Sequence, residues 1–475
     1  MKKKELISKD LADKSDNPDS KILINHLSRS ERYEAGKQLR KACPRSSHAK
    51  WEAQKNRHDP VDLILESDKG RIQKLLPLRH GRMARTPFTF YRGAALNLAA
   101  DLSTTPVTGM YVQACGDAHL CNFGGFATPE RNVIFSINDL DETLPAPWEW
   151  DVKRLAASFV VASRNNNFND KFARETAMEC VRSYRENMIV FSEMKTMELW
   201  HHSLGSEHLI SKIKDPELMH RGLKRLEKER ARSIAEEIFP QIAEGSGKSR
   251  FIKDELPSIF HWEGHLPGDV SKEARDAIEQ YKTSLPPGFS FLLSRYELKD
   301  LVIKVVGVGS VGTACWVALF MTGDGDPLFI QVKEARKSVL EAYAGNSIFS
   351  NHGQRVVYGY RLMQPFSDPF LGWSAGSEGR HFFFRQLRDI KISLKVETFG
   401  KTQMMGFADW CGQALALSHA RSGDSAMLSG YMGNSNTFDL AIGEFSMAYA
   451  DQNEKDHASL KKAIKSGKID AEFEE

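Results

Sequence analysis

Residue types that can do chemistry gather in the stretch "CGDAHLCNFG", residues 115–124, which holds Asp117, His119 and Asn122. An apolar run, "IFSINDLDE", follows shortly after it and ends in three acidic residues: Asp139, Asp141 and Glu142. Carboxylate and amide oxygens are hard ligands that suit Mg²⁺, which binds one or two carboxylates together with phosphate oxygens. The two stretches therefore predict a metal-assisted chemistry, provided that the fold brings them together.

A short hairpin is the element expected to position these residues. Residues 123–127 and 133–137 are rich in apolar residues, and the segment "TPERN" between them contains two turn formers, a proline and an asparagine. Pairing of these two runs would place the loop that carries Asp117 beside the strand end that leads to Asp139.

An Asp, an Asn five residues later, a hairpin and a further Asp form the layout of a kinase-like phosphoryl-transfer site. The form "GDxHxxN" resembles the aminoglycoside and choline phosphotransferases. On this resemblance Asp117 is the base, Asn122 and Asp139 are Mg²⁺ ligands, and Asp141 is the alternative metal ligand. His119 is a second catalytic candidate, with hydrogen bonding to the loop backbone as its alternative role.

The same acidic, amide and histidine residues also have other possible roles. Asp and Asn beside glycines also occur as plain turn residues, and acidic residues before a helix favour its N-terminus. Asp141 and Glu142 precede the helix expected from "WEWDVKRL", so capping or a salt bridge is an alternative for them. The triplet "DAH" also opens two-metal phosphoesterase sites, but the accompanying motifs "GDxxD" and "GNH" do not occur in the sequence.

A glycine pattern, Gly307, Gly309 and Gly312, forms a GxGxxG. A dinucleotide-binding fold requires a helix after this pattern, whereas the following "TACWVALFM" favours a strand. Strand, glycine turn and strand predict the phosphate-covering turn of a kinase-like lobe, and Lys333 in "PLFIQVKEA" then matches the phosphate-binding lysine. Glu341 is its expected partner, with Glu334 as the weaker candidate. A plain hairpin and a solvated strand end are the alternatives.

The order of the two patterns is unusual, because in ordinary kinases the glycine-rich sheet precedes the catalytic loop. Here it follows, so the lobes are expected in permuted order. A competing assignment makes "HARSGD" the catalytic loop, with His419, Arg421 and Asp424 as site residues. It lacks an Asn five residues after Asp424, where Ser429 stands, so a helix C-cap is the favoured role there.

Several segments together resemble one bacterial family, the domain of unknown function numbered 2252 (DUF2252), which is placed with the protein-kinase-like superfamily. They are "PLRHGRMARTPFTFYRGAA", the stretch from "CGDAHLCNFG" to "WEWDVKRLAAS", "VVGVGSVGTACW", "PLFIQVKEA" and "HARSGD". The resemblance runs from about Arg40 to Ala458 and implies a kinase-like two-lobe architecture without naming a substrate. Ser136 and Leu140 depart from the expected "FDINDFDE".

A basic run precedes the first motif and is a further phosphate-contact candidate, with a solvated helix face or internal salt bridges as the favoured roles: Arg79, His80, Arg82, Arg85 and Arg92. Later runs predict strands: "LVIKVV", "TACWVALFM", "PLFIQVK", "QRVVYGYRLMQPF" and "RHFFFRQL".

The chain of 475 residues has a net charge of +3 and six cysteines without a CxxC pair. We therefore expect a soluble, cytoplasmic protein with no nucleic-acid partner and no membrane partner. The expected fold is α+β, a kinase-like two-lobe fold in permuted order. Its expected parts are a flexible or extended arm (1–50), a helical catalytic lobe (51–290), a sheet-rich nucleotide-binding lobe (291–400) and C-terminal helices with a tail (401–475).

The expected function is an ATP- and Mg²⁺-dependent phosphotransferase that acts on an unidentified small-molecule acceptor. Two alternatives stay open: a pseudokinase-like nucleotide-binding or scaffold protein, and a nucleotidyl (AMP) transferase on the same fold.

Overall fold

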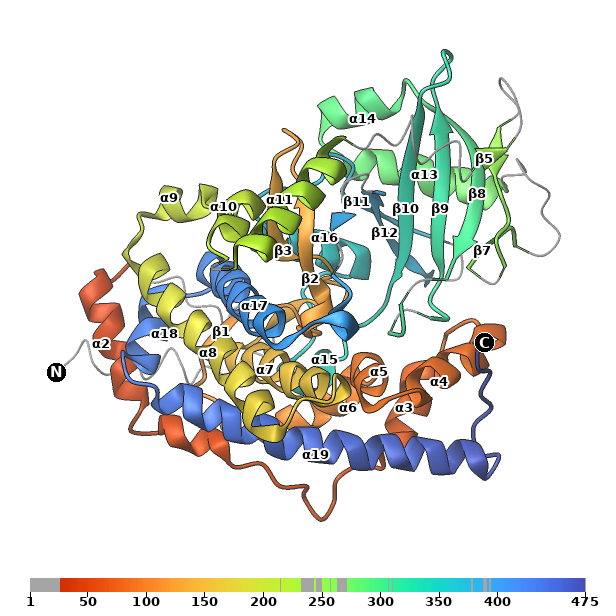
Figure 1. Ribbon diagram of the computed structural model, residues 1–475. Coiled ribbons are helices and arrows are strands. Elements are labelled where there is room, and N and C mark those ends of the chain that lie inside the picture. The colour runs from red at the N-terminus through yellow and green to blue at the C-terminus, as the bar shows by residue number, and fades with distance from the viewer. Residues whose placement is uncertain are drawn as a thin grey trace.

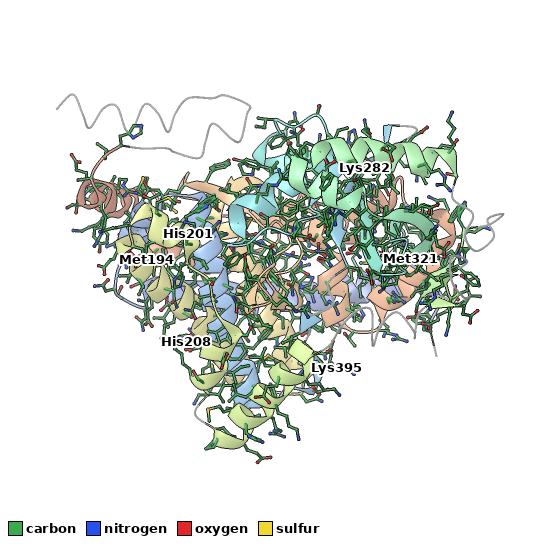
Figure 2. The ribbon with its side chains drawn as sticks, turned by 90° about the horizontal axis from the view of Figure 1, so that it is seen from above. Met194, His201, His208, Lys282, Met321 and Lys395 are labelled. Carbon is green, nitrogen blue, oxygen red and sulfur yellow. The ribbon has the colours of Figure 1, made fainter. Side chains whose placement is uncertain are left out.

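The computed structural model describes residues 26–213, 215–231, 243–244, 250–256, 258–262, 271–305, 307–309, 311–376, 379–387, 391–392 and 394–474. The chain forms a helical part and a part built around an antiparallel sheet, which confirms the mixed helix and sheet class (Figure 1). Seen from above, Lys282 and Met321 lie on the side of the sheet, and Met194, His201 and His208 lie on the opposite side (Figure 2).

The described strands of the second part form a six-stranded antiparallel sheet in the order β11-β12-β10-β9-β8-β7. These strands are β7 (Ile259–Phe260), β8 (Glu297–Lys304), β9 (Cys315–Met321), β10 (Pro327–Ala335), β11 (Gly372–Ala375) and β12 (His381–Gln386). Four of the expected strands are thereby confirmed as β8, β9, β10 and β12. The connection from β8 to β9 contains the glycine pattern, as expected.

Helices α13 (Lys272–Ser284) and α14 (Pro287–Leu293) belong to the sheet part. Tyr281 of α13 stacks on Phe384 of β12 with ring centroids 4.1 Å apart, within an apolar cluster between helix and sheet. The sheet part therefore begins before residue 291, inside the segment expected to be catalytic.

Long helices build the core of the helical part, at the lower left of Figure 1. They are α7 (Trp148–Asn165), α8 (Asp170–Glu193), α17 (Lys401–Ser422) and α19 (Thr437–Lys465), and the short helix α18 (Ser425–Met432) packs on α8. Trp148 of α7 is fully buried and stacks on Tyr184 of α8, which is a packing role and not a chemical one. Residues 401–465 thus pack into the helical part and do not form a unit of their own.

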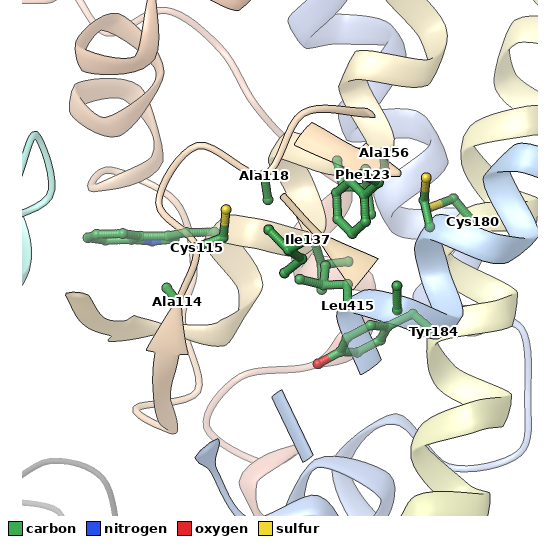
Figure 3. Packing of buried hydrophobic residues seen from close by; sticks show 14 of the residues in the cluster. Ala114, Cys115, Ala118, Phe123, Ile137, Ala156, Cys180, Tyr184 and Leu415 are labelled. Atoms are coloured by element: carbon green, nitrogen blue, oxygen red, sulfur yellow. The ribbon is translucent and has the colours of Figure 1, made fainter. Parts of the chain in front are cut away.

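The hairpin expected between the two motifs is present. Strands β2 (Phe123–Ala127) and β3 (Val133–Ile137) pair antiparallel, and β13 (Lys391–Ile392) adds to the outer edge of β2. Strands β1 (Tyr111–Ala114) and β4 (Leu144–Pro147) form a separate pair that flanks the same loops. Figure 3 shows Ala118, Phe123 and Ile137 packed together near Leu415 of α17, so the motif loop rests on the hydrophobic core.

Shorter elements complete the chain. Before the first motif they are α2 (Arg29–Leu39), η2 (Arg45–Ala49), α3 (Pro60–Asp68), η3 (Gln73–Leu75), α4 (Leu76–Ala84), α5 (Pro87–Gly93) and α6 (Ala95–Leu102). Later ones are η4 (Leu120–Asn122), α9 (Thr196–His201), α10 (Ser206–Ser211), α11 (Pro216–Ala231), β5 (Ala243–Glu244), β6 (Phe251–Ile252), α15 (Glu341–Ala344), α16 (His352–Met363) and η7 (Val396–Thr398). None of the described helices is both long enough and apolar enough to cross a bilayer.

One expectation about local structure is wrong. The run "QRVVYGYRLMQPF" is mainly helix α16 and not a strand, because the Asn351 side chain caps the helix and Val356, Tyr360 and Met363 are buried at helical spacing. The described part of the N-terminal arm contains helix α2, which begins at Arg29 and packs on α18. Residues 1–25 of that arm lie outside the described residues.

The backbones of helices α2 and α18 are in contact where the helices cross. Alanine substitution should therefore have opposite effects on stability at Gly430, which lies in this contact, and at Gly406, which does not. A Cβ on Gly430 would lie 2.0 Å from the Tyr33 carbonyl oxygen, whereas a Cβ on the exposed Gly406 of α17 would meet nothing within 4 Å. We expect Gly430→Ala to destabilise the fold by about 1–3 kcal/mol, because the helices must move apart. Gly406→Ala should stabilise it by roughly 0.5–1 kcal/mol.

Urea unfolding followed by circular dichroism measures both changes. Equal unfolding midpoints for Gly430→Ala and the unchanged protein would contradict the close crossing, with Gly406→Ala as the matched control.

Candidate active site

Helix α7 holds the loop that carries Asp117 through hydrogen bonds to the loop backbone. Oδ2 of Asp151 accepts the N–H of Cys115 at 2.6 Å, and its Oδ1 accepts the N–H of Gly116 at 3.0 Å. The ring of His419 on α17 lies 3.1 Å from Asp151 and fixes this carboxylate. Gly116 has φ of 81°, and a Cβ there would lie 2.5 Å from the Glu142 carbonyl oxygen, so only glycine fits.

Asp117 is paired with a buried arginine one turn further along α7. Nε of Arg154 donates to Oδ1 of Asp117 at 2.6 Å, and Nη2 donates to the same oxygen. The Asp117 side chain keeps 20% exposure, whereas Arg154 is buried. Burial raises the pKa of Asp117 to about 6, against the charge of Arg154, which lowers it. Asp117 is thus a carboxylate whose pKa lies near the range useful to a general base.

His119 lies behind Asp117 in the same loop. Its Nε2 is 3.8 Å from Oδ2 of Asp117, and its buried Nδ1 has no hydrogen-bond partner among the described residues. Burial and the charges of Arg92 and Arg154 hold the pKa of His119 well below its usual value. The ring is therefore neutral at physiological pH and lies beside the candidate base.

Asn122 closes the loop and connects it to the hairpin. Its Nδ2 donates to the Asp117 carbonyl at 2.7 Å, which leaves Oδ1 as the acceptor atom of the side chain. Its own carbonyl accepts the N–H of Asn138 at 2.7 Å, directly before Asp139, and this bond extends the β2–β3 ladder by one step. The hairpin therefore aligns the two predicted metal-binding segments, as expected from the sequence.

Lys333 joins the two sequence patterns. From β10, its Nζ lies 3.2 Å from Oδ1 of Asp139 and 2.5 Å from Oδ2 of Asp141. Lys333 is buried, with its ammonium group 5.5 Å from the centre of the Phe383 ring on β12. The strand that carries Lys333 is therefore in direct contact with the acidic segment after β3, although Lys333 and Asp139 are 194 residues apart in the sequence.

The three charges at this junction shift one another's pKa values. Burial would lower the pKa of Lys333, but the two carboxylates raise it above its ordinary value. Burial would raise the pKa of Asp139, but Lys333 and a hydrogen bond with Asp141 hold it below its usual range. Burial and the negative charge of Asp139 raise the pKa of Asp141. The pair is therefore electrostatically asymmetric, with Asp139 the more readily ionised member.

Three residues around this junction were missed by the sequence reasoning. Arg385 of β12 donates from Nη1 to the Asn138 carbonyl at 3.0 Å and to the Tyr360 hydroxyl at 2.9 Å. Arg355 of α16 donates from Nη2 to the Asp141 carbonyl at 2.9 Å. Together they fix the backbone around the acidic pair. No motif marks them, because their positions depend on where α16 and β12 pack.

The expected pairing of Glu341 with Lys333 is wrong. Glu341 is buried, and its Oε1 accepts the Ser338 N–H at 3.0 Å while its Oε2 accepts the Ser347 N–H at 3.3 Å. These bonds tie down the short connection after β10. The weaker candidate, Glu334, is next to Lys333 in the strand, so its side chain points to the opposite face of the sheet. There it accepts the Ala314 N–H at 3.1 Å.

The glycine turn is docked on the segment between α3 and α4. Nη1 of Arg71 donates to the Gly309 carbonyl at 2.9 Å, and the Ile72 N–H donates to the Gly312 carbonyl at 2.7 Å. Gly307 and Gly312 have φ of 49° and 86°, values that favour glycine. The strand that follows the turn, β9, pairs with β10 and so places the turn close to the lysine-bearing strand.

The residues of "HARSGD" have structural roles. His419 supports Asp151, as described above, and Arg421 donates to main-chain carbonyls that include Leu362 and Gln364. Asp424 is an N-cap and not a C-cap, because its Oδ1 accepts the N–H groups at the start of α18, those of Ala426 and Met427.

A cavity of about 640 Å³ lies on the other face of the sheet. Trp316, Val332 and Phe384 contribute to its lining, and Val332 pairs with both of the others across the sheet. Because neighbouring residues of a strand point to opposite faces, Lys333 points away from this cavity. The cavity is therefore separated by the sheet from the acidic pair.

The donor set at the junction suits a hard divalent cation. It offers the two carboxylates of Asp139 and Asp141, and Oδ1 of Asp141 is buried without a hydrogen-bond partner among the described residues. No group of three or more His, Cys, Asp or Glu side chains within the described ranges is arranged to hold a metal ion. Mg²⁺ does not need such a group, since phosphate oxygens and water complete its coordination.

Comparison with known proteins identifies the family. The comparisons with curated proteins and with solved structures gave no match. The model of one family, described as an uncharacterized protein conserved in bacteria (DUF2252), matches residues 71–463, a span that contains the catalytic-loop candidates, the hairpin, the glycine turn and Lys333. This chain therefore belongs to the DUF2252 family.

Proposed function

We propose that this protein is a kinase-like phosphotransferase that uses ATP and Mg²⁺ and acts on a small-molecule acceptor. The observation that carries the proposal is the contact of Lys333 with Asp139 and Asp141, beside the loop of Asp117 and Asn122. A lysine on a strand of an antiparallel sheet, a glycine turn earlier in the same sheet, and an Asp–Asn–Asp series are the parts that kinase-like phosphoryl transfer requires.

The order of elements in the sheet part supports the same proposal. β8, the glycine turn, β9 and β10 follow one another, and a helical segment then precedes β11 and β12. Kinases place a glycine-rich turn and then a lysine-bearing strand in this order. The permuted order of the two lobes stays part of the proposal, as does the kinase-like class itself.

Each residue of the site has a distinct role in this mechanism. Asp117 accepts the proton of the acceptor hydroxyl, and Arg154 orients it. Asn122, Asp139 and Asp141 would hold Mg²⁺, which when bound neutralises phosphate charge. Lys333 is the cation that faces the phosphates. Catalysis then depends on positioning and on charges that are already in place, because phosphoryl transfer asks for little covalent chemistry from the protein.

Nucleotide binding gives the first test. We expect calorimetric titration to show Mg²⁺-dependent ATP binding that weakens by roughly tenfold or more in Lys333→Ala and in Asp139→Asn, since each removes a charge that faces the ligand. Lys299→Ala is the matched control, because Lys299 lies on β8 of the same sheet and pairs with Glu297 at the surface.

Binding that is independent of Mg²⁺, or unchanged in both site variants, would refute the proposed function. With an acceptor in hand, the product mass separates the two transfer reactions, because adenylyl transfer adds AMP and phosphoryl transfer adds phosphate. Tight ATP binding without any turnover would favour the pseudokinase-like alternative.

The ionisation of Asp117 gives the second test. Its pKa is raised to about 6, so the basic form of Asp117 is lost as pH falls through 6 and activity should fall with it. We expect ¹³C NMR of the Asp117 carboxyl to show a midpoint near this pH. Arg154→Met should move the midpoint upward, because the positive charge that lowers the Asp117 pKa is gone.

Asp117→Asn assigns the resonance and should abolish turnover while leaving the protein folded. A midpoint near the ordinary aspartate value of roughly 4 in the unchanged protein, or one that Arg154→Met does not move, would contradict this account of the site.

A further inference from the structure

The fold gives internal partners to four residues of the basic run before the first motif, and it leaves Arg92 without an acidic partner within the described ranges. Nη1 of Arg79 donates to Asp68 at 2.7 Å, and the ring of His80 lies 2.8 Å from the other oxygen of Asp68. Arg82 donates twice to the Glu474 carboxylate, and Arg85 donates to the Glu474 carbonyl at 2.6 Å. These four side chains are therefore used in holding α3 and the C-terminal segment on α4.

Arg92, in the last turn of α5, has no such partner in the part of the chain that the structure describes. Among the described residues no carboxylate pairs with its guanidinium, and its Nε is buried without a hydrogen-bond partner. Its contact is with the Phe88 ring, whose centre lies 5.8 Å from the guanidinium carbon. A partly buried cation without a counter-charge is unfavourable unless an anion completes it.

The position of Arg92 indicates which anion would pair with it. A Cβ on Gly309 would lie 3.2 Å from the Arg92 carbonyl oxygen, so α5 touches the glycine turn. Its charge also acts on the catalytic loop. Arg92 contributes to the lowered pKa of the buried His119 in that loop. Figure 1 shows α5 between the end of the sheet and the helical part.

We propose that Arg92 binds the terminal phosphoryl group of the nucleotide. This inference rests on the proposed phosphotransferase function. A guanidinium group presents a planar pair of donors that matches two phosphate oxygens, and a cation held in place stabilises the charge on a phosphoryl group during transfer.

The transfer balances without help from Arg92 as an acid or a base. The acceptor oxygen forms a bond to the γ-phosphorus, the bond from the γ-phosphorus to the bridging oxygen breaks, and the electron pair leaves with ADP. The acceptor proton goes to Asp117. Arg92 only donates hydrogen bonds to the transferred group, so its loss should affect ATP more than ADP.

The test compares titrations of Mg·ATP and Mg·ADP in four proteins: the unchanged chain, Arg92→Gln, Arg92→Lys and Arg85→Gln. We expect Arg92→Gln to weaken ATP binding by roughly 10- to 100-fold, the effect of one hydrogen bond to a charged group, and to change ADP binding by less than about twofold. Arg92→Lys keeps the charge without the planar donors and should lie between. Arg85→Gln, in the same basic run, should match the unchanged chain.

The outcomes separate the two proposals. If the unchanged chain binds Mg·ATP and Arg92→Gln binds it equally well, the role of Arg92 is refuted and the proposed function stands. Equal losses for ATP and ADP would also refute a contact with the terminal phosphoryl group. If the unchanged chain binds neither nucleotide, the proposed function fails and this inference fails with it. Thermal unfolding of each variant shows whether a loss reflects misfolding.

Discussion

The ion pair of Lys333 with Asp139 and Asp141 is the interaction on which the rest of the site depends. It joins the sheet part to the hairpin of the helical part, although Lys333 and Asp139 are 194 residues apart in the sequence. The buried Lys333 ammonium and the two partly buried carboxylates are thereby brought together. Removing one member of such a group leaves the others uncompensated, which is costly away from water. The surrounding elements must therefore hold all three together, and Arg355, Tyr360 and Arg385 do so by binding the backbone around the acids.

Helix α7 supplies the second constraint. Asp151 and Arg154 are one turn apart on the helix, so both face the loop that carries Asp117. Asp151 accepts two backbone N–H groups of this loop, and Arg154 binds the Asp117 side chain. Helix α7 therefore fixes both the backbone of this loop and the Asp117 carboxylate, so their orientation is set by the fold.

Local sequence patterns predicted the elements that depend on neighbouring residues. The β2–β3 hairpin, the strand of Lys333 and the glycine turn follow from apolar runs and turn formers, and the structure has all three. The prediction of a strand for "QRVVYGYRLMQPF" was wrong. Its β-branched and aromatic residues favour a strand when local propensity alone is considered. The helix cap at Asn351 and the burial of one helical face outweigh this propensity, so the segment forms helix α16.

The sequence by itself determined which residue types stand at the site, the spacing of Asp117 and Asn122 within one loop, and membership in a bacterial family. Only the tertiary structure decided that Lys333 pairs with Asp139 and Asp141 and not with Glu341, and that Arg92 has no acidic partner among the described residues while its neighbours have internal ones. Spacing fixes contacts within a loop or a hairpin. Contacts between distant segments depend on how the elements pack, and many carboxylates compete for each cation until that packing selects one.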